Sequence, residues 1–323
     1  MKNLSKSFLI LTLTLICAAT AYCQIGMRII MNRKVYMQYE PIYACITLRN
    51  DSGRALLFGQ DPKLQGFIYF LIRDNKGRTI AKRPAKEIAT TGILLKPGES
   101  RNLIIQVNDY YDLDKPGTYS INVCLAHNML PQELKCKTER TFQIDQGIEV
   151  WSAKVGVPDL SEKASGNRPA KERKYSIRTL LDHPSKHYYL VVEDEEMIYG
   201  VSRIGKQVGI EKFKAEVDML GRIHLLMPIS PRVFHYLTFS LDGVNTASTY
   251  WRTSDSIPTI YRDSKTGFVR RVGGTEAKPG LDFTPGTGGV TASKLLDANS
   301  PKAAEGIVDL NKDVANYGQE PTD

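Results

Sequence analysis

Alternation of apolar and polar side chains is the feature that most constrains the fold of this chain. Residues 41–49 are the clearest example, with Ile42, Ala44, Ile46 and Leu48 on one face and Tyr43, Cys45, Thr47 and Arg49 on the other. A period of two places successive side chains on opposite faces of a β-strand. The segment therefore predicts a half-buried strand, which the turn-forming residues 50–53 end.

Segments of this kind continue to about residue 151. We predict further strands at 67–73, 103–107, 119–125 and 141–144, separated by turns at 74–77, 96–99 and 115–117. In one of them the side chains expected to face inward are Tyr119, Ile121, Val123 and Leu125. About seven short strands with regular turns predict an all-β chain that begins with an antiparallel sandwich over residues 24–151.

The turns of this first domain carry a resemblance. The series Leu48-Arg49-Asn50-Asp51-Ser52-Gly53, Pro97-Gly98-Glu99-Ser100 and Pro116-Gly117-Thr118-Tyr119 resembles bacterial immunoglobulin-like domains, including those of the intracellular proteinase-inhibitor type. The resemblance implies an immunoglobulin-like sandwich, and its last element is similar to a tyrosine corner. The chain departs from the antibody pattern, because alternation puts Cys45 and Cys124 on outward faces and no core disulfide between them is expected.

The second half predicts another antiparallel β-domain. Residues 152–173 are rich in Lys, Ser, Gly, Pro and Glu and are interpreted as a linker, and strands resume over 174–274. The stretch 218–226 resembles the blade hairpins of secreted propellers, but a closed propeller needs at least ~4 blades. An antiparallel sandwich or open barrel is therefore favoured, with a partial propeller as the alternative. Residues 275–323 have the Gly- and Pro-rich composition of a flexible tail.

The N-terminus has the layout of a secretory signal peptide, residues 1–23. Lys2 and Lys6 precede the apolar run 8–21, and small residues follow just before Gln24. An uncleaved anchor is disfavoured because spanning a bilayer takes ~20 apolar residues. Lipidation of Cys23 is disfavoured because Tyr22 stands where a small residue is expected. We expect export to the periplasm or the exterior, with no transmembrane helix after cleavage.

Charge and cysteines narrow the function further. The formal net charge of +8 is scattered, which disfavours a nucleic-acid partner. Cys124 and Cys136 are symmetric about Leu130 in two predicted strands. A hairpin in that register would place the two thiols face to face, so we predict a disulfide, with two free buried thiols as the alternative.

The polar residues form no recognised catalytic or metal-binding motif. His183 and His187 are four apart, but Pro184 between them argues against a shared helical face. The acidic sets Asp109, Asp112, Asp114 and 193–196 read as solvated turns. Aromatic residues that could stack on sugars are better explained as core: Tyr188, Tyr189, Tyr236, Tyr250 and Trp251. We predict no catalytic, cofactor-binding or metal-binding residues and no cofactor.

These features favour a non-enzymatic binding or structural protein of the bacterial envelope or exterior. Its expected partner is an unknown protein or a cell-surface polymer. The contact loop we predict lies within 126–132 and contains His127, Asn128, Met129, Leu130 and Pro131. Two alternatives stay open: a proteinase inhibitor presenting residues 129–131, and a hydrolase whose site is assembled from distant strands.

Overall fold

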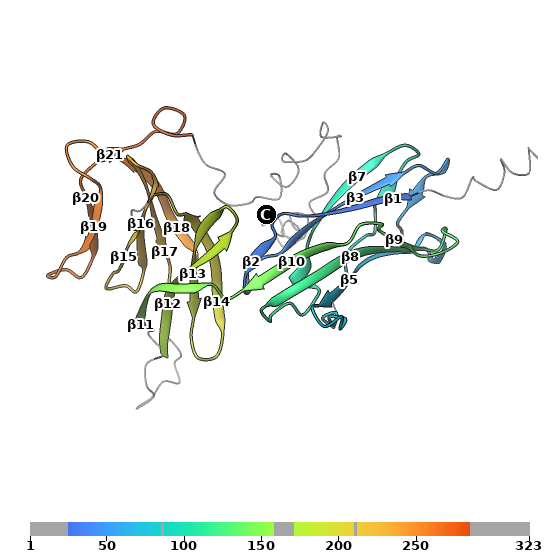
Figure 1. Cartoon of the computed structure of the whole chain (residues 1–323), viewed down its shortest axis with the longest axis horizontal. Helices are drawn as coiled ribbons and strands as arrows, with labels where there is room; N and C mark the ends of the chain where they lie inside the picture. Colours follow the sequence, from blue (N-terminus) through green and yellow to red (C-terminus); the bar gives the residue numbers. More distant parts are fainter. Residues whose placement is uncertain (1–24, 85–86, 158–170, 210–211, 285–323) are drawn as a thin grey trace, which may run out of the picture.

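The chain folds into two β-sandwiches that lie side by side (Figure 1). The computed structural model describes residues 25–84, 87–157, 171–209 and 212–284. Strands dominate this part of the chain, and its only helical segments are the short 3₁₀ turns η1 (Pro62–Leu64) and η2 (Val107–Asp109). The prediction of an all-β fold is therefore confirmed. The predicted signal peptide lies outside the described residues.

Two sheets form the first sandwich. The first sheet has the order β1 (Ile25–Met31), β3 (Tyr43–Asn50) and β7 (Ser100–Gln106). The second has the order β2 (Val35–Met37), β10 (Arg140–Asp145), β8 (Gly117–His127) and β5 (Gly66–Asp74), with β9 (Leu134–Lys135) paired to β8. A small ladder joins β4 (Leu56–Leu57) to β6 (Leu94–Leu95). All pairs are antiparallel except β2 with β10, which run parallel.

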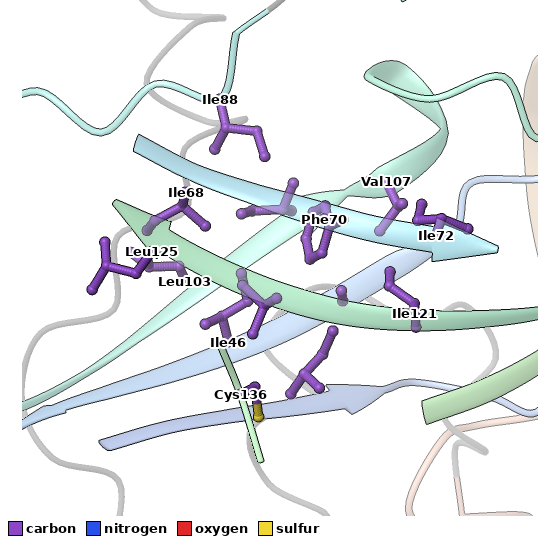
Figure 2. Packing of buried hydrophobic residues seen from close by; sticks show 14 of the residues in the cluster. Ile46, Ile68, Phe70, Ile72, Ile88, Leu103, Val107, Ile121, Leu125 and Cys136 are labelled. Atoms are coloured by element: carbon purple, nitrogen blue, oxygen red, sulfur yellow. The ribbon is translucent and has the colours of Figure 1, made fainter. Parts of the chain in front are cut away.

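The core of this sandwich follows from the alternation in its strands. Ala44, Ile46 and Leu48 of β3 face the inward side chains of β5 and β8 across the space between the sheets. Figure 2 shows Ile68, Phe70 and Ile72 of β5 beside Ile121 and Leu125 of β8 in this layer. Burying such side chains contributes about 1.5–3 kcal/mol each, which drives the two sheets together.

Turn chemistry fixes the connections that the sequence predicted. The Asp74 carboxylate accepts hydrogen bonds from the backbone N–H groups of Lys76 and Arg78, and Gly77 adopts φ +77° within that turn. At the start of β8, the Tyr119 hydroxyl donates to the Lys115 carbonyl oxygen over 2.7 Å. This bond closes the corner through which the chain enters β8.

The second sandwich also packs two sheets. One has the order β11 (Ile148–Val157), β12 (Lys171–Asp182), β13 (Ser185–Glu193) and β14 (Ile198–Lys206). The other has the order β15 (Lys214–Val217), β16 (Ile223–Ser230), β17 (Val233–Phe239), β18 (Asn245–Arg252) and β21 (Thr275–Glu276). Tyr175, Leu190 and Val192 of the first sheet meet Leu225 and Phe239 of the other in one core. The module is therefore a sandwich, the favoured interpretation, and not a partial propeller.

A separate hairpin covers the far side of this second sandwich. It consists of β19 (Thr259–Arg262) and β20 (Val269–Val272). Ile260 and Val269 of the hairpin pack with Leu226, Phe234 and Tyr236 on the face of the sheet opposite the main core.

The domain boundaries differ from those expected. Residues 148–157 form β11, which pairs along its length with β12, so the predicted linker begins inside the second sandwich. The chain passes between the sandwiches through residues 146–147 alone. The predicted tail also begins too early, because β21 pairs with β18 and Phe283 packs on the Tyr250 ring with centroids 4.4 Å apart.

Candidate functional site

The predicted contact loop is a tightly held turn. The His127 ring accepts the Met129 N–H at Nδ1 over 3.0 Å and lies 3.0 Å from the Leu57 carbonyl oxygen at Nε2. Together these contacts require a neutral imidazole that carries its proton on Nε2 and donates it to Leu57. Leu130 belongs to the core, whereas the Met129 side chain is 48% exposed. Met129 is therefore the apolar side chain that this loop offers to a partner.

The three cysteines of the described residues are free thiols, so the predicted Cys124–Cys136 disulfide is not formed. The register explains the error, because Cys124 pairs with Lys135 instead of Cys136. A slip of one residue turns a side chain to the other face of a sheet. The Cys136 thiol accordingly points into the core and donates to the Met27 carbonyl oxygen, while Cys124 lies on the opposite face. Cys45 also lies outside the core cluster, on the outward face that alternation predicts.

The joint between the sandwiches has an apolar contact. Met37 of β2 packs with Leu180 of β12 and Tyr189 of β13, and all three side chains are buried. Gly147 in the connection has φ +67°, and a Cβ there would lie 2.7 Å from Met37 Cε and 2.9 Å from the Thr179 carbonyl oxygen. The two-residue connection and this packing bring the two sandwiches into direct contact.

A buried ion pair lies in the same joint. Arg33 Nη2 is 2.7 Å from Glu40 Oε1, and Arg33 Nη1 donates to the Tyr189 hydroxyl of the second sandwich over 2.7 Å. Burial raises the pKa of the Glu40 carboxyl, and the neighbouring Arg33 opposes that rise. Burial likewise raises the pKa of the Tyr189 hydroxyl. Sequence reasoning missed this cluster, since Tyr189 lies far along the chain from Arg33 and Glu40.

His187 lies near the joint on β13. Burial and the positive charges of Arg203, Lys206 and Arg33 lower its pKa to about 4. His183, the other member of the predicted pair, lies in the turn between β12 and β13. Among the described residues, no group of three or more His, Cys, Asp or Glu side chains is arranged to hold a metal ion.

The predicted acidic clusters serve local structure. Asp109 accepts from Gln106 Nε2 over 2.9 Å, and Asp114 pairs with Arg83 over 2.9 Å. Glu193, the last residue of β13, pairs with Arg178 over 2.8 Å, and Asp194 in the following turn accepts two backbone N–H groups. These interactions match the expectation of polar turns.

A histidine relay occurs in the second sandwich. His224 Nε2 is 3.2 Å from Asp218 Oδ2, and His224 Nδ1 is 2.6 Å from the Tyr236 hydroxyl. The Asp218 carboxylate also accepts from Arg222 Nε and from the backbone N–H groups of Leu220 and Arg222. The Asp218 carboxylate closes the β15–β16 turn in this way. This structural role is enough to explain why Asp218, His224 and Tyr236 are linked by hydrogen bonds.

The aromatic residues do not form one platform. Tyr188 enters the core and Tyr189 the joint. Tyr250 stacks on His235 with centroids 4.3 Å apart, whereas Trp251, its neighbour on β18, faces the other way and lies under the Arg271 guanidinium. The expectation that these rings serve packing agrees with their positions.

An apolar cavity of about 460 Å³ opens beside β5 in the first sandwich. It is lined by the edge of β5, by residues 79–82, by Glu87 and Ile88, and by Tyr111. Sequence reasoning missed this cavity, because the lining comes from separate segments and carries no motif.

The described part of the molecule is thus a two-sandwich protein whose cavity lies in the first sandwich. Residues 27–144, from β1 into β10, match the family model described as flagellar collar protein C, N-terminal domain. Among the solved structures that match is a crystal structure of the YadV chaperone, with 8% sequence identity and a TM-score of 0.21. That match covers 70% of this chain and 99% of the chaperone chain. No curated protein matches the chain. No helix among the described residues is long and apolar enough to cross a membrane.

Proposed function

We propose that this chain is a structural protein of the bacterial cell envelope that takes part in a flagellum-associated assembly. The observation that carries the proposal is the match of residues 27–144 to the N-terminal domain of flagellar collar protein C. The packed joint supports it, because two sandwiches that contact each other through buried side chains suit a building block better than two modules joined by a long linker.

The first sandwich is further proposed to be immunoglobulin-like. Its order β1-β3-β7 against β2-β10-β8-β5 corresponds to strands A-B-E against A′-G-F-C of that fold. The hydrogen bond from the Tyr119 hydroxyl to Lys115 has the form of a tyrosine corner at the start of strand F. Domains of this kind present loops from a rigid frame, and the exposed Met129 lies in one such loop.

Export completes the proposal. A flagellum-associated envelope protein must leave the cytoplasm, and residues 1–23 have the three-part layout that a signal peptidase recognises. We propose cleavage just before Gln24, or two residues earlier after Ala21, and release without a lipid anchor.

The test is a deletion strain of the source bacterium studied by electron cryotomography. We expect density around the flagellar base to be lost on deletion and restored by the full-length gene. A gene that lacks codons 2–23 is the matched control and should restore nothing, because its product stays in the cytoplasm. Unchanged flagellar structures in the deletion strain would contradict the structural role, and cytoplasmic recovery of the full-length product would contradict export.

A further inference from the structure

Among the residues that the structure describes, none forms a strand beside the edge of β5 that faces the cavity. β5 is the outermost strand of its sheet, and its inner edge pairs with β8 from Gly66 to Asp74. The chain begins a hairpin on the outer edge, where the Ile80 N–H donates to the Ile72 carbonyl oxygen over 2.9 Å. It then leaves β5, since Lys82 pairs with Tyr111. Within the described ranges, no backbone group pairs with the outer edge of β5 from Ile68 to Phe70.

The outward N–H and C=O groups of β5 differ in whether they have hydrogen-bond partners. In an antiparallel ladder, alternate residues direct both N–H and C=O to the same side. Gly66, Ile68, Phe70 and Ile72 direct theirs outward, away from β8. The Thr90 hydroxyl donates to the Gly66 carbonyl oxygen and the Tyr111 hydroxyl accepts the Phe70 N–H, each over 2.8 Å. The Ile68 N–H and C=O and the Phe70 C=O are left without a partner among the described residues.

Apolar side chains line the space beside these groups. Ile68, Phe70, Ile88 and Tyr111 are each less than 10% exposed and form the deep part of the cavity. Figure 2 shows Ile88 on the side of β5 away from β8, where it faces the uncovered edge. A residue paired with Ile68 directs its side chain to the same face of the sheet as Ile68, which is the face of the core. Such a side chain would enter the cavity.

Charge at the mouth selects the kind of segment that fits. Lys82 and Glu87 are the two charged residues of the lining, and they pair with each other over 3.7 Å. The described residues of the lining therefore carry no net charge, which favours an uncharged segment. The cavity volume of about 460 Å³ falls within the ~300–1,000 Å³ of ligand pockets.

We propose that β5 accepts an extended, uncharged peptide segment of a partner protein by β-strand addition at Ile68. The segment takes the place that the hairpin leaves, exchanges both backbone hydrogen bonds with Ile68, and inserts one apolar side chain into the cavity. Main-chain bonds supply affinity and the cavity supplies specificity, which is the usual division in strand addition. The inference goes beyond the proposed function and does not depend on it.

The experiment uses the purified chain and a synthetic decapeptide in which Val and Thr alternate around one central Leu. Backbone NMR should show shifts of the Ile68 and Phe70 amide signals, with a Kd below about 100 μM. The matched peptide with N-methylated backbone on the pairing edge keeps its apolar side chains and should bind at least tenfold more weakly. Equal binding of both peptides, or no binding at 1 mM, would overturn the proposal.

Protein variants locate the site. Ala81→Trp fills the mouth and should weaken binding at least tenfold. Ala247→Trp, at an exposed alanine of β18, is the control and should stay within twofold of the parent. Amide shifts that cluster outside residues 66–90 would overturn the assignment even if Ala81→Trp fails to fold. Neither binding nor its absence tests the proposed envelope role, because the experiment uses only purified protein and a synthetic peptide.

Discussion

At the residue scale, the Arg33–Glu40 pair makes the sharpest prediction. Both side chains are buried in the joint, and the loss of one partner leaves the other charge without compensation. We expect Arg33→Met to lower the free energy of unfolding by about 3–5 kcal/mol, measured by urea denaturation.

Two further variants separate pairing from packing. The double variant Arg33→Met/Glu40→Met should recover much of the loss, because no unpaired charge then remains buried. Arg49→Met breaks the exposed pair with Asp51 and should cost less than about 1 kcal/mol. A double variant as unstable as Arg33→Met would show that the charge of Glu40 is not the cause.

Two histidines give a prediction about how the stability of the fold depends on pH. Burial lowers the pKa of His187 and of His235 to about 4, below the ordinary value of 6.5. The unfolded chain therefore binds more protons than the folded chain between these values, and stability falls as the pH falls from 6.5 to 4. We expect the urea midpoint to decrease over this window.

The variants His187→Gln and His235→Gln check the source of this dependence. Each should flatten the slope of stability against pH, and the double variant should flatten it most. His183→Gln is a suitable control, because the His183 side chain is exposed and lies in the turn between β12 and β13. A slope unchanged in the double variant would assign the pH dependence to other groups.

At the element scale, the two-residue connection between β10 and β11 gives a prediction about Gly147. A side chain there meets Met37 and the Thr179 carbonyl oxygen, and the residue has φ +67°. Gly147→Ala should therefore destabilise the fold by more than the ~1–2 kcal/mol that left-handed backbone alone costs. Gly77→Ala is the matched control, since Gly77 has φ +77° with nothing within 4 Å of the added Cβ.

Solution scattering provides the second measurement for this variant. Gly147→Ala should change the scattering profile at intermediate angles, because the sandwiches must separate or rotate to admit the methyl group. Gly77→Ala should reproduce the parent profile. Equal effects of the two variants on stability and scattering would show that the joint is looser than its packing indicates.

Strands could be predicted where burial is one-sided. Alternation located β3 and β8, and the inward set of β8 is confirmed in the core from Tyr119 to Leu125. β11 was missed because it is an edge strand with mostly exposed or half-buried side chains, so its composition resembles that of a linker. The Cys124–Cys136 register was missed by one residue, since the sequence does not reveal which residue of the short strand β9 meets β8.

The joint and the cavity could not be predicted for a different reason. Arg33 and Tyr189 belong to different sandwiches, and Ile68, Ile88 and Tyr111 come from separate segments of the first. No local pattern encodes such contacts, because they depend on how completed sheets pack. The predicted contact loop lies in a turn of the chain, but the sequence did not show that Leu130 turns inward and Met129 outward.

At the scale of the whole molecule, the cysteines report on opening of the fold. Cys45, Cys124 and Cys136 are buried free thiols, and burial raises the pKa of the Cys45 and Cys124 thiols. We expect a maleimide reagent to label them slowly in the native protein and fully in urea, with rates set by opening of the structure. Tryptic mapping that recovers Cys124 linked to Cys136 would contradict the free-thiol structure.

The connection through Gly147 has a mechanical consequence for any assembly that contains this chain. Tension between the sandwiches enters β10 at one end and β11 at the other, along the length of each strand. β10 is held by β2 and β8, and β11 by β12, so the load acts in shear across whole ladders. Hydrogen bonds loaded in shear must break together instead of one after another. The molecule can therefore transmit a pulling force between its two halves without a yielding hinge.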